Sequence, residues 1–258
     1  MSINLWRRLS SSGTIQGMSG HSKWSTIKRQ KETKDQARGK TFSKLAKSIV
    51  VAVKAGGSSS PETNYKLRMA IETARAANMP KDNIERAISR AANEPANIEE
   101  ITYEGFGPGG VGVLVEVATD NRNRTGQEIK NVFEKQGGSF APGALAHNFE
   151  PKGMILVEKK SQIDEQILAL IDLGVEEVEE GGDGIEIYTS PQELFDKKNQ
   201  IEKQGFKVLK SSLIKKPKTF GLVKDRQTSQ QIWALLHGLE EHEDVENVYT
   251  NADFAKTD

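Results

Sequence analysis

The stretch Val111–Val117, of sequence VGVLVEV, marks the point at which the chain changes from helices to a sheet. Its apolar run favours a strand, and Tyr103 to Gly110 leads into it through a glycine- and proline-rich turn. Upstream, the apolar period is close to 3.6 residues. One stripe falls within roughly 80° of a helical wheel and consists of Phe42, Leu45, Ile49 and Val53. The chain is therefore expected to begin with helices and to continue as α/β structure.

The helical part is expected to cover residues 18–97 and to contain several helices with distinct breaks. Glycines and serines at 56–60 end one helix, and Ser60 as N-cap with Pro61 in the first helical position starts the next. Met79-Pro80-Lys81-Asp82 predicts another stop and restart, and residues 93–97 predict a linker. This part of the chain is interpreted as a basic helical domain.

Beyond the first strand, Asp120 or Asn121 can cap a helix, and Ala144–Phe149 is expected to be a returning strand. Between Met154 and Leu213 the pattern predicts strand, helix, strand, strand, helix, strand, which is the ferredoxin-like order. A helix over Ser229–Leu239 and a strand over Val245–Tyr249 then follow. We expect this tail to return to the first α/β domain and complete its sheet.

The expected fold is therefore an α+β multidomain protein. An N-terminal helical bundle precedes two α/β domains, one of them ferredoxin-like and inserted in the other. The predicted segments are an extension or targeting segment at 1–17, the basic helical domain at 18–97, an α/β domain at 98–150 plus 217–258, and the insert at 151–216.

The composition excludes several kinds of chemistry. The chain has 258 residues and no cysteine, so disulfides, thiolate metal sites and thiol nucleophiles are ruled out. No apolar run approaches the roughly 18 residues that a membrane-spanning helix needs. We therefore expect no membrane partner.

Charge is distributed very unevenly along the chain. The whole sequence balances 36 basic against 36 acidic residues, yet residues 1–60 hold 12 Lys and Arg against only Glu32 and Asp35. Residues 98–258 hold 18 basic against 29 acidic residues. Such asymmetry directs the basic part of the chain toward a polyanion, most often nucleic acid.

Residues 1–17 carry Arg7 and Arg8 and no acid, with Ile3, Trp6 and Leu9 on the opposite side of a helical wheel. This pattern is typical of a mitochondrial presequence. The alternative is an upstream start before Met18, which would leave a cytoplasmic protein. The segment is not expected to belong to the fold.

The predicted nucleic-acid site is the lysine-rich surface of the helical domain. Counterion release would favour phosphate binding there, and a tryptophan offers a stacking surface for an unpaired base. Lys40, Lys44, Lys47 and Lys54 lie opposite the apolar stripe and are expected to face solvent. The predicted residues are Lys23, Trp24, Lys28, Arg29, Lys31, Lys34, Arg38, Lys40, Lys44 and Lys47.

Arg122 and Arg124, beside the expected start of a helix, form a second cationic spot. They are candidates for the same nucleic-acid ligand. Pairing with acidic side chains of the same chain is the alternative, and the sequence leaves both interpretations open.

Catalysis is not expected. The Gly105–Gly110 segment matches G-x-G-x-x-G, but a strand follows it instead of the helix that a dinucleotide site requires, so a tight turn is favoured. The four histidines have no metal-ligand spacing. Residues 161–196 hold eleven acids and no Lys or Arg, which favours a solvated acidic face. We therefore predict no cofactor, metal or small-molecule substrate, and the glycine loop leaves a nucleotide-binding enzyme as one alternative.

Four separated motifs resemble the YebC family. They are the segment Met18–Trp24 with the lysine-rich helix after it, Ala77–Ala87, Tyr103–Gly110 with Thr119–Thr125, and Val248–Asp253. The resemblance runs from Met18 to Phe254. It implies a helical domain and two α/β domains, and a non-enzymatic nucleic-acid binder.

The family resemblance supports two different ligands. Some members are labelled transcriptional regulators that bind DNA, whereas others are ribosome-associated factors that relieve stalling, notably at proline-rich stretches. A mitochondrial relative is a translational activator of cytochrome c oxidase. Residues 23–54 hold eight Lys and only two Arg, which favours following phosphates over reading bases. Ribosomal RNA is therefore the expected partner, with promoter DNA and a pure protein scaffold as the alternatives.

Overall fold

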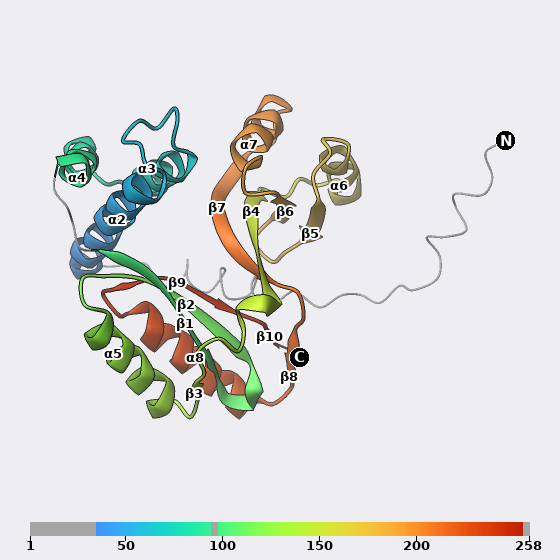
Figure 1. Cartoon of the computed structure of the whole chain (residues 1–258). Coiled ribbons are helices and arrows are strands. Elements are labelled where there is room, and N and C mark those ends of the chain that lie inside the picture. Colours follow the sequence, from blue (N-terminus) through green and yellow to red (C-terminus); the bar gives the residue numbers. More distant parts are fainter. Residues whose placement is uncertain (1–34, 94–97, 255–258) are drawn as a thin grey trace.

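The computed structural model describes residues 35–93 and 98–254, with side chains from residue 41 onward. These residues form three packed groups (Figure 1). The helical unit is residues 35–93, the central unit is residues 98–148 with 218–254, and the third unit is residues 149–217. The fold is mixed α/β with largely antiparallel sheets, and the boundaries of the predicted domains stay predictions.

The helical unit holds α2 (Asp35–Ala55), α3 (Tyr65–Ala76) and α4 (Lys81–Asn93). These helices surround an apolar core because each presents one stripe of small or branched side chains to the others. Among the described residues this core includes Ile49, Val53, Leu67, Ala74 and Ile84. The predicted stripe on α2 is confirmed, with Phe42 and Leu45 partly buried against the same core.

The predicted start of α3 at Ser60 and Pro61 is wrong, because Asn64 caps this helix. The Asn64 side-chain oxygen accepts a hydrogen bond from the Leu67 backbone N–H at 3.0 Å. Its amide also donates to the backbone carbonyls of Ala52 at 2.7 Å and Ser58 at 2.8 Å. A buried asparagine that closes the end of α2 and the start of α3 together outweighs the local preference of Ser60 and Pro61.

The central sheet has the strand order β3-β1-β2-β9. Its strands are β1 (Glu99–Phe106), β2 (Gly112–Thr119), β3 (Ser139–Phe140) and β9 (Val245–Thr250). Both α5 (Arg122–Lys135) and α8 (Arg226–Glu240) cover one face, as Figure 1 shows below the sheet. The odd-numbered valines of β2 are buried against these helices because strand side chains alternate between faces.

Two predicted features of the central unit are wrong. The predicted lead-in at Tyr103–Gly110 is a turn only at Pro108–Gly110, and its first part belongs to a strand, β1, over Glu99–Phe106. The expected strand over Ala144–Phe149 is instead a turn and a short 3₁₀ helix at Ala146–Asn148. The buried Glu104 carboxylate accepts the backbone N–H groups of Leu145 at 2.5 Å and Ala146 at 3.0 Å. This carboxylate satisfies the backbone that a strand would otherwise pair.

The C-terminal segment adds strands to the central unit. The β9 strand pairs antiparallel with β2, and the short β8 (Gly221–Val223) pairs in parallel with β10 (Ala252–Phe254). The β8–β10 pair was not predicted, because three-residue strands carry too little pattern to detect. Trp233 of α8 stacks on Phe254, with 4.6 Å between ring centroids.

The third unit follows the element order expected from the sequence. Its elements are β4 (Phe149–Val157), α6 (Ile163–Ile171), β5 (Glu177–Glu180), β6 (Ile185–Thr189), α7 (Leu194–Lys203) and β7 (Val208–Pro217). The strand order is β5-β6-β4-β7, antiparallel throughout. The core under α6 and α7 includes Ile155, Ile187, Leu170 and Leu194.

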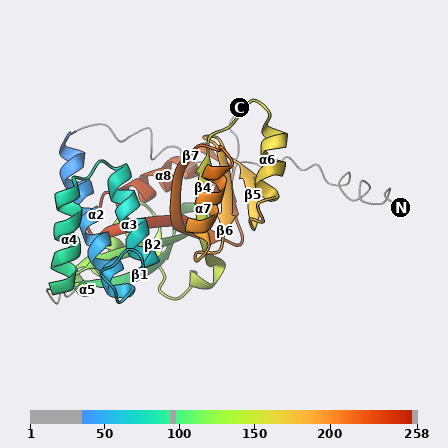
Figure 2. The ribbon, with the colours of Figure 1, turned by 90° about the horizontal axis from the view of Figure 1, so that it is seen from above.

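The three units contact one another directly. Tyr188 and Ile214 of the third sheet share a core with Leu114 and Tyr249 of the central sheet. Between α3 and α7, which lie near each other in Figure 2, Lys198 forms an ion pair with Glu72 at 2.8 Å. The arrangement of the units is therefore fixed by packing as well as by chain connection. None of the helices described is long and apolar enough to cross a membrane.

Candidate nucleic-acid interface

Half of the twelve predicted nucleic-acid residues precede the part of the chain that the structure describes. Lys23, Trp24, Lys28, Arg29, Lys31 and Lys34 lie outside the described residues. Arg38 and Lys40 belong to the first turns of α2, where the backbone alone is described. The structure therefore tests the expected geometry at the later cations, which are Lys44, Lys47, Arg122 and Arg124.

The prediction that Lys44 and Lys47 face open solvent is wrong. The Lys44 ammonium donates to the backbone carbonyl of Glu240 at 2.6 Å, at the carboxyl end of α8. Lys47 forms an ion pair with Asp244 at 2.5 Å. A helical wheel locates the side of α2 opposite its core, but it gives no sign that the central unit packs there. These two lysines hold the helical unit against the central unit.

Asp244 is the centre of this contact, and its side chain is fully buried. Its carboxylate accepts hydrogen bonds from Lys47, from Arg124 at 2.9 Å and from Thr125 at 2.7 Å. A longer bond of 3.2 Å comes from Thr119. Burial alone would favour the neutral acid, but these donors outweigh it and hold the pKa of Asp244 well below its usual range. We call Asp244 and its four donors the Asp244 cluster.

The start of α5 explains why Arg124 and Thr125 converge on Asp244. Asn121 caps the helix by accepting the Arg124 backbone N–H at 3.1 Å, which confirms one of the two predicted caps. The Asn121 backbone N–H donates to the Thr119 hydroxyl at 3.0 Å. The end of β2 and the first turn of α5 are thereby held next to the segment that precedes β9.

Of the two open interpretations of Arg122 and Arg124, pairing within the chain holds for Arg124. Its guanidinium contacts Asp120 at 3.2 Å in addition to Asp244. Arg122 differs, because it is exposed and has no ion pair with any carboxylate of the described residues. Arg122 remains a candidate for binding phosphate, and Arg124 does not.

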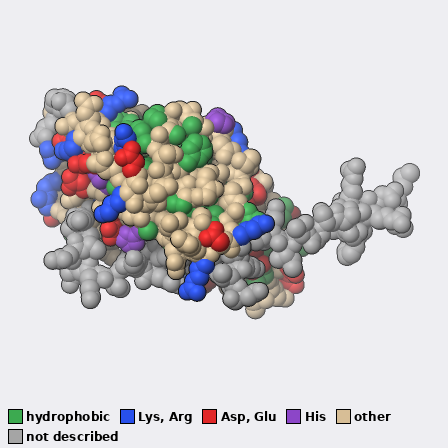
Figure 3. Space-filling view, turned by 90° about the horizontal axis from the view of Figure 1, so that it is seen from below, with side chains coloured by type: hydrophobic (Ala, Val, Ile, Leu, Met, Phe, Trp, Pro, Cys, Tyr) green, Lys and Arg blue, Asp and Glu red, His purple; other side chains and the backbone are tan. Residues whose placement is uncertain are grey.

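The face formed by α5 and α8 does not carry one sign of charge. Figure 3 shows Lys and Arg side chains interspersed with Asp and Glu across it. A polyanion is attracted by a continuous basic surface, so this face is a poor candidate for the interface. The basic excess lies instead in the helical unit, where residues 35–93 hold eleven Lys and Arg against five Asp and Glu.

Several cations of the helical unit lie outside the site predicted from the sequence, which followed only the lysine-rich start. Lys54 was expected to face solvent but was not included in that site. Among the described residues, the cations of this unit that form no ion pair with a carboxylate include Lys54, Lys66, Arg75 and Arg86. Arg68 also lacks one, but it donates to the backbone carbonyls of Pro61 and Glu62. Their signal in the sequence is weak because they are scattered over three helices instead of forming one run.

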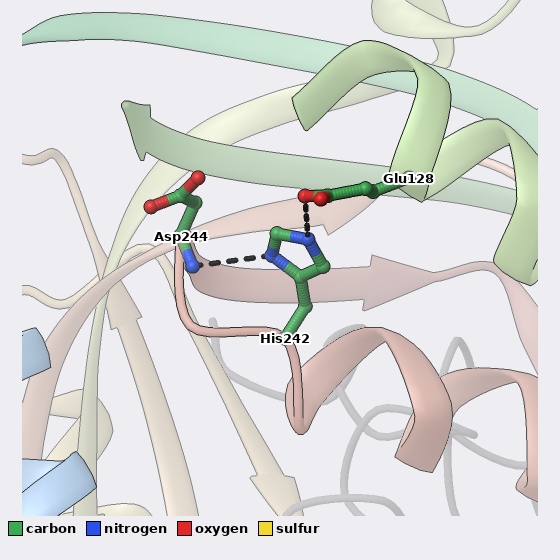
Figure 4. A group of neighbouring side chains, drawn as sticks. All are labelled: Glu128, His242 and Asp244. Carbon is green, nitrogen blue, oxygen red and sulfur yellow. Dashed lines mark hydrogen bonds and ion pairs between the residues drawn. The ribbon is translucent and has the colours of Figure 1, made fainter. Parts of the chain in front are cut away.

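One group of side chains has the composition of a metal site. Glu128, His242 and Asp244 place potential ligand atoms within 4.8 Å of one another (Figure 4). However, both ring nitrogens of His242 are occupied, one by Glu128 at 2.9 Å and the other by the Asp244 backbone N–H at 3.1 Å. Lys47 and Arg124 already neutralise the Asp244 carboxylate. The donor set therefore favours a hydrogen-bonded contact over a bound divalent cation.

A second carboxylate, which is partly buried, lies close to the Asp244 cluster. Glu246 of β9 accepts a hydrogen bond from the Ser48 hydroxyl of α2 at 2.7 Å. Burial is the main reason that the pKa of Glu246 rises to about 7, and the negative charges of Glu100 and Glu116 raise it further. The Ser48 bond opposes this shift without cancelling it. The contact between α2 and the central sheet thus includes one ionised carboxylate and one that titrates near neutral pH.

The glycine-rich segment joins two strands. After β1, residues Pro108–Gly110 form a 3₁₀ turn, and Gly109 and Gly110 have φ values of 74° and 76°. The turn closes when the Gly107 N–H donates to the Val111 carbonyl at 2.8 Å. Positive φ at these positions accounts for the glycines. A helix amino terminus, which a dinucleotide phosphate would require, does not follow the loop.

The fold defines a mixed α/β protein whose basic residues are concentrated in a helical N-terminal part. Two family models match it: the TACO1/YebC protein N-terminal domain over residues 22–94, and the TACO1/YebC second and third domain over residues 98–252. The chain belongs to the TACO1/YebC family.

Proteins from several bacteria are similar over nearly the whole chain. One from Dictyoglomus thermophilum is 47% identical over 241 residues, covering 92% of this chain and 96% of the relative. One from Aquifex aeolicus is 45% identical, covering 91% and 95%. Both carry the name probable transcriptional regulatory protein. The crystal structure of the conserved hypothetical protein Aq1575 from Aquifex aeolicus matches with a TM-score of 0.78 and 43% identity, covering 86% of this chain and 93% of that one.

Proposed function

We propose that this protein is a non-enzymatic regulator of gene expression that binds nucleic acid through its helical unit and the basic segment before it. The observation that carries the proposal is the concentration of 12 Lys and Arg against two acids in residues 1–60. The names of the relatives, which are called probable transcriptional regulatory proteins, support a regulatory role.

The Asp244 cluster reduces the number of cations that we propose as contacts for nucleic acid. Lys47 and Arg124 neutralise a fully buried carboxylate, so releasing either of them to a phosphate would leave part of that charge uncompensated. Lys44 is likewise engaged at the end of α8. The proposed contact residues are therefore the cations before residue 41, together with exposed cations such as Lys54 and Arg75.

Ribosomal RNA is the ligand that we propose, and DNA is the second candidate. Lysine dominates the basic segment, and lysine follows phosphates without the bidentate geometry that arginine uses to read guanine. Trp24 adds a stacking surface suited to unpaired bases in irregular RNA. DNA is favoured only by the names of the relatives, which are called probable transcriptional regulatory proteins.

The first experiment measures binding to purified ribosomes, to a structured RNA and to duplex DNA of equal phosphate number, at several salt concentrations. If about six phosphates are neutralised, affinity for the RNA should fall with a log–log slope of roughly −4. Ribosomes and RNA should be bound more tightly than DNA at every salt concentration. A flat salt profile would contradict phosphate binding, and preference for the duplex would favour the second candidate.

A charge-reversal variant locates the interface. Lys23, Lys28 and Lys31 changed together to Glu should weaken ribosome binding by at least about tenfold, because each phosphate contact contributes to the salt-dependent term. The matched control reverses three exposed lysines of the other units, Lys130, Lys135 and Lys203, and should bind as the unaltered protein does. Lys47 is unsuitable for this test, since its reversal would disturb folding. Equal loss in both triple variants would show that overall charge, not the proposed interface, determines binding.

A further inference from the structure

The outer face of α6 exposes two large apolar side chains on one side of the helix. Leu168 is 62% exposed and Ile171 is 49% exposed, although both lie in a well-packed unit. Residues three apart are neighbours on a helix surface, so these side chains form one strip. In Figure 1, α6 lies at the edge of the third unit, away from the central sheet.

The packing of α6 inside its own unit is already complete without this strip. Leu170 is fully buried in the core, and Ile163 and Ile167 pack against the same core. The buried Gln166 side chain accepts the Lys160 backbone N–H at 2.8 Å and donates to the Glu158 carbonyl at 2.9 Å. The strip is therefore an additional surface and not a poorly formed part of the core.

Three carboxylates border the strip. Asp164, Glu165 and Asp172 lie on the same helix or at its end, all exposed, and none forms an ion pair with a cation of the described residues. Some other acids of this unit differ in this respect, since Glu176 pairs with Lys152 and Glu180 pairs with Lys159. The strip thus combines exposed apolar area with negative charge that this part of the chain leaves uncompensated.

We propose that this strip is a docking surface for a basic amphipathic helix of a partner protein. Apolar side chains of the partner would cover Leu168 and Ile171, and its Lys or Arg residues would pair with the three bordering carboxylates. A second copy of this chain fits poorly, because the same carboxylates would face each other across a symmetric contact. Nucleic acid fits poorly as well, since phosphates are repelled by carboxylates. The proposal is independent of the proposed RNA interface, which lies in the helical unit.

A peptide titration with the full-length protein tests the proposal. The probe is a fluorescein-labelled amphipathic peptide with leucines along one face and lysines on both flanks. Its controls are a scrambled peptide and a version with glutamates in place of the lysines. Because the apolar area is small, binding should be weak, in the micromolar range. The leucine–lysine helix should bind more tightly than either control peptide.

Matched variants locate the contact. The double variant Leu168→Ser/Ile171→Ser should weaken peptide binding by at least about tenfold, as should Asp164→Asn/Glu165→Gln/Asp172→Asn. The apolar control is Leu222→Ser, because Leu222 is 58% exposed in the central unit. The acidic control is Glu202→Gln, an exposed position on α7. Unchanged binding in the α6 variants, or equal losses in the controls, would overturn the proposal.

Photo-crosslinking examines the physiological partner. A benzophenone amino acid at position 168, in the full chain added to a cell extract, should crosslink to a peptide rich in Lys and Arg. The same group at position 222 should not give that product. A crosslink to RNA, to another copy of this chain or to an acidic peptide would contradict the proposal, as would equal yields at both positions.

Discussion

Asp244 and Glu246 are two carboxylates in one segment that both contact α2, yet their ionisation differs. Lys47, Arg124 and two threonines stabilise the charge of Asp244, which keeps its pKa well below the usual range. Glu246 receives one hydrogen bond, from Ser48, and its pKa rises to about 7. The donors around a carboxylate, more than its burial, therefore decide whether it is charged.

The basic residues of α2 are likewise of two kinds, those that pair with a buried acid and those that are exposed. Lys47 projects from α2 toward a buried acid and stabilises the fold, whereas Lys54, seven residues later, is exposed without an ion pair to a described carboxylate. Sequence alone places both on the polar side of one helix. The difference between them arises from a contact with a segment almost 200 residues away.

The largest effect is expected for Lys47→Glu. This change removes a cation from Asp244 and places a second carboxylate beside it, which should lower the free energy of unfolding by about 3 kcal/mol. The matched variant Lys54→Glu should change it by no more than about 0.5 kcal/mol. Urea denaturation followed by circular dichroism measures both. Equal effects in the two variants would show that the Lys47–Asp244 ion pair contributes nothing specific.

A somewhat smaller effect is expected for Asp244→Asn. Removing the charge leaves Lys47 and Arg124 without their common partner, but both side chains keep partial exposure, 33% and 41%, and can be resolvated. The free energy of unfolding at pH 7 should fall by about 2 kcal/mol.

The stabilisation that ionised Asp244 contributes should depend on pH in one direction. Because the folded-state pKa of Asp244 is depressed, its stabilisation is present above the unfolded pKa of about 3.9 and is lost as pH falls below it. The variant and the unaltered protein should therefore converge in stability at acidic pH. A constant difference between pH 3 and 7 would argue against an ionised Asp244.

A feature of the fold could be predicted from the sequence where it depends on residues that are close together in the chain. The apolar stripe on α2 and the βαββαβ order of the third unit follow from periodicities within a few turns or strands. The Asn121 cap was among the expected possibilities because caps act within four residues. The α3 start was missed because Asn64 is selected by its bonds to the preceding loop and helix, which no propensity describes.

The Asp244 cluster was not predicted because its members are widely separated in the sequence. Thr119, Arg124 and Thr125 lie in a motif that resembles the YebC family, but nothing near them in the sequence indicates a partner 119 to 125 residues later. Charge counting identified the basic surplus correctly. It could not distinguish cations that bind the protein's own acids from cations that remain available.

Glu246→Gln should produce the opposite change from Asp244→Asn. Because the folded-state pKa of Glu246 is raised, the protein loses stability as pH rises from about 4.5 toward 7. Glutamine resembles the protonated acid and can still accept the Ser48 hydrogen bond. The variant should be more stable by about 1–2 kcal/mol above pH 7 and equal to the unaltered protein near pH 4. A gain that is the same at both pH values would rule out titration of Glu246 as its source.

The smallest effect is expected for Ser48→Ala, which removes the one hydrogen bond that opposes the raised pKa of Glu246. The free energy of unfolding should fall by about 0.5–1 kcal/mol above pH 7, where the carboxylate is ionised and most needs a donor. The pKa of Glu246, followed by ¹³C NMR of the labelled carboxyl group, should move further upward. In the Glu246→Gln background the same serine change should no longer alter the pH dependence of stability. If Ser48→Ala still altered the pH dependence of stability in the Glu246→Gln background, Ser48 would act on another group. Glu246 would then not be the group that titrates near neutral pH.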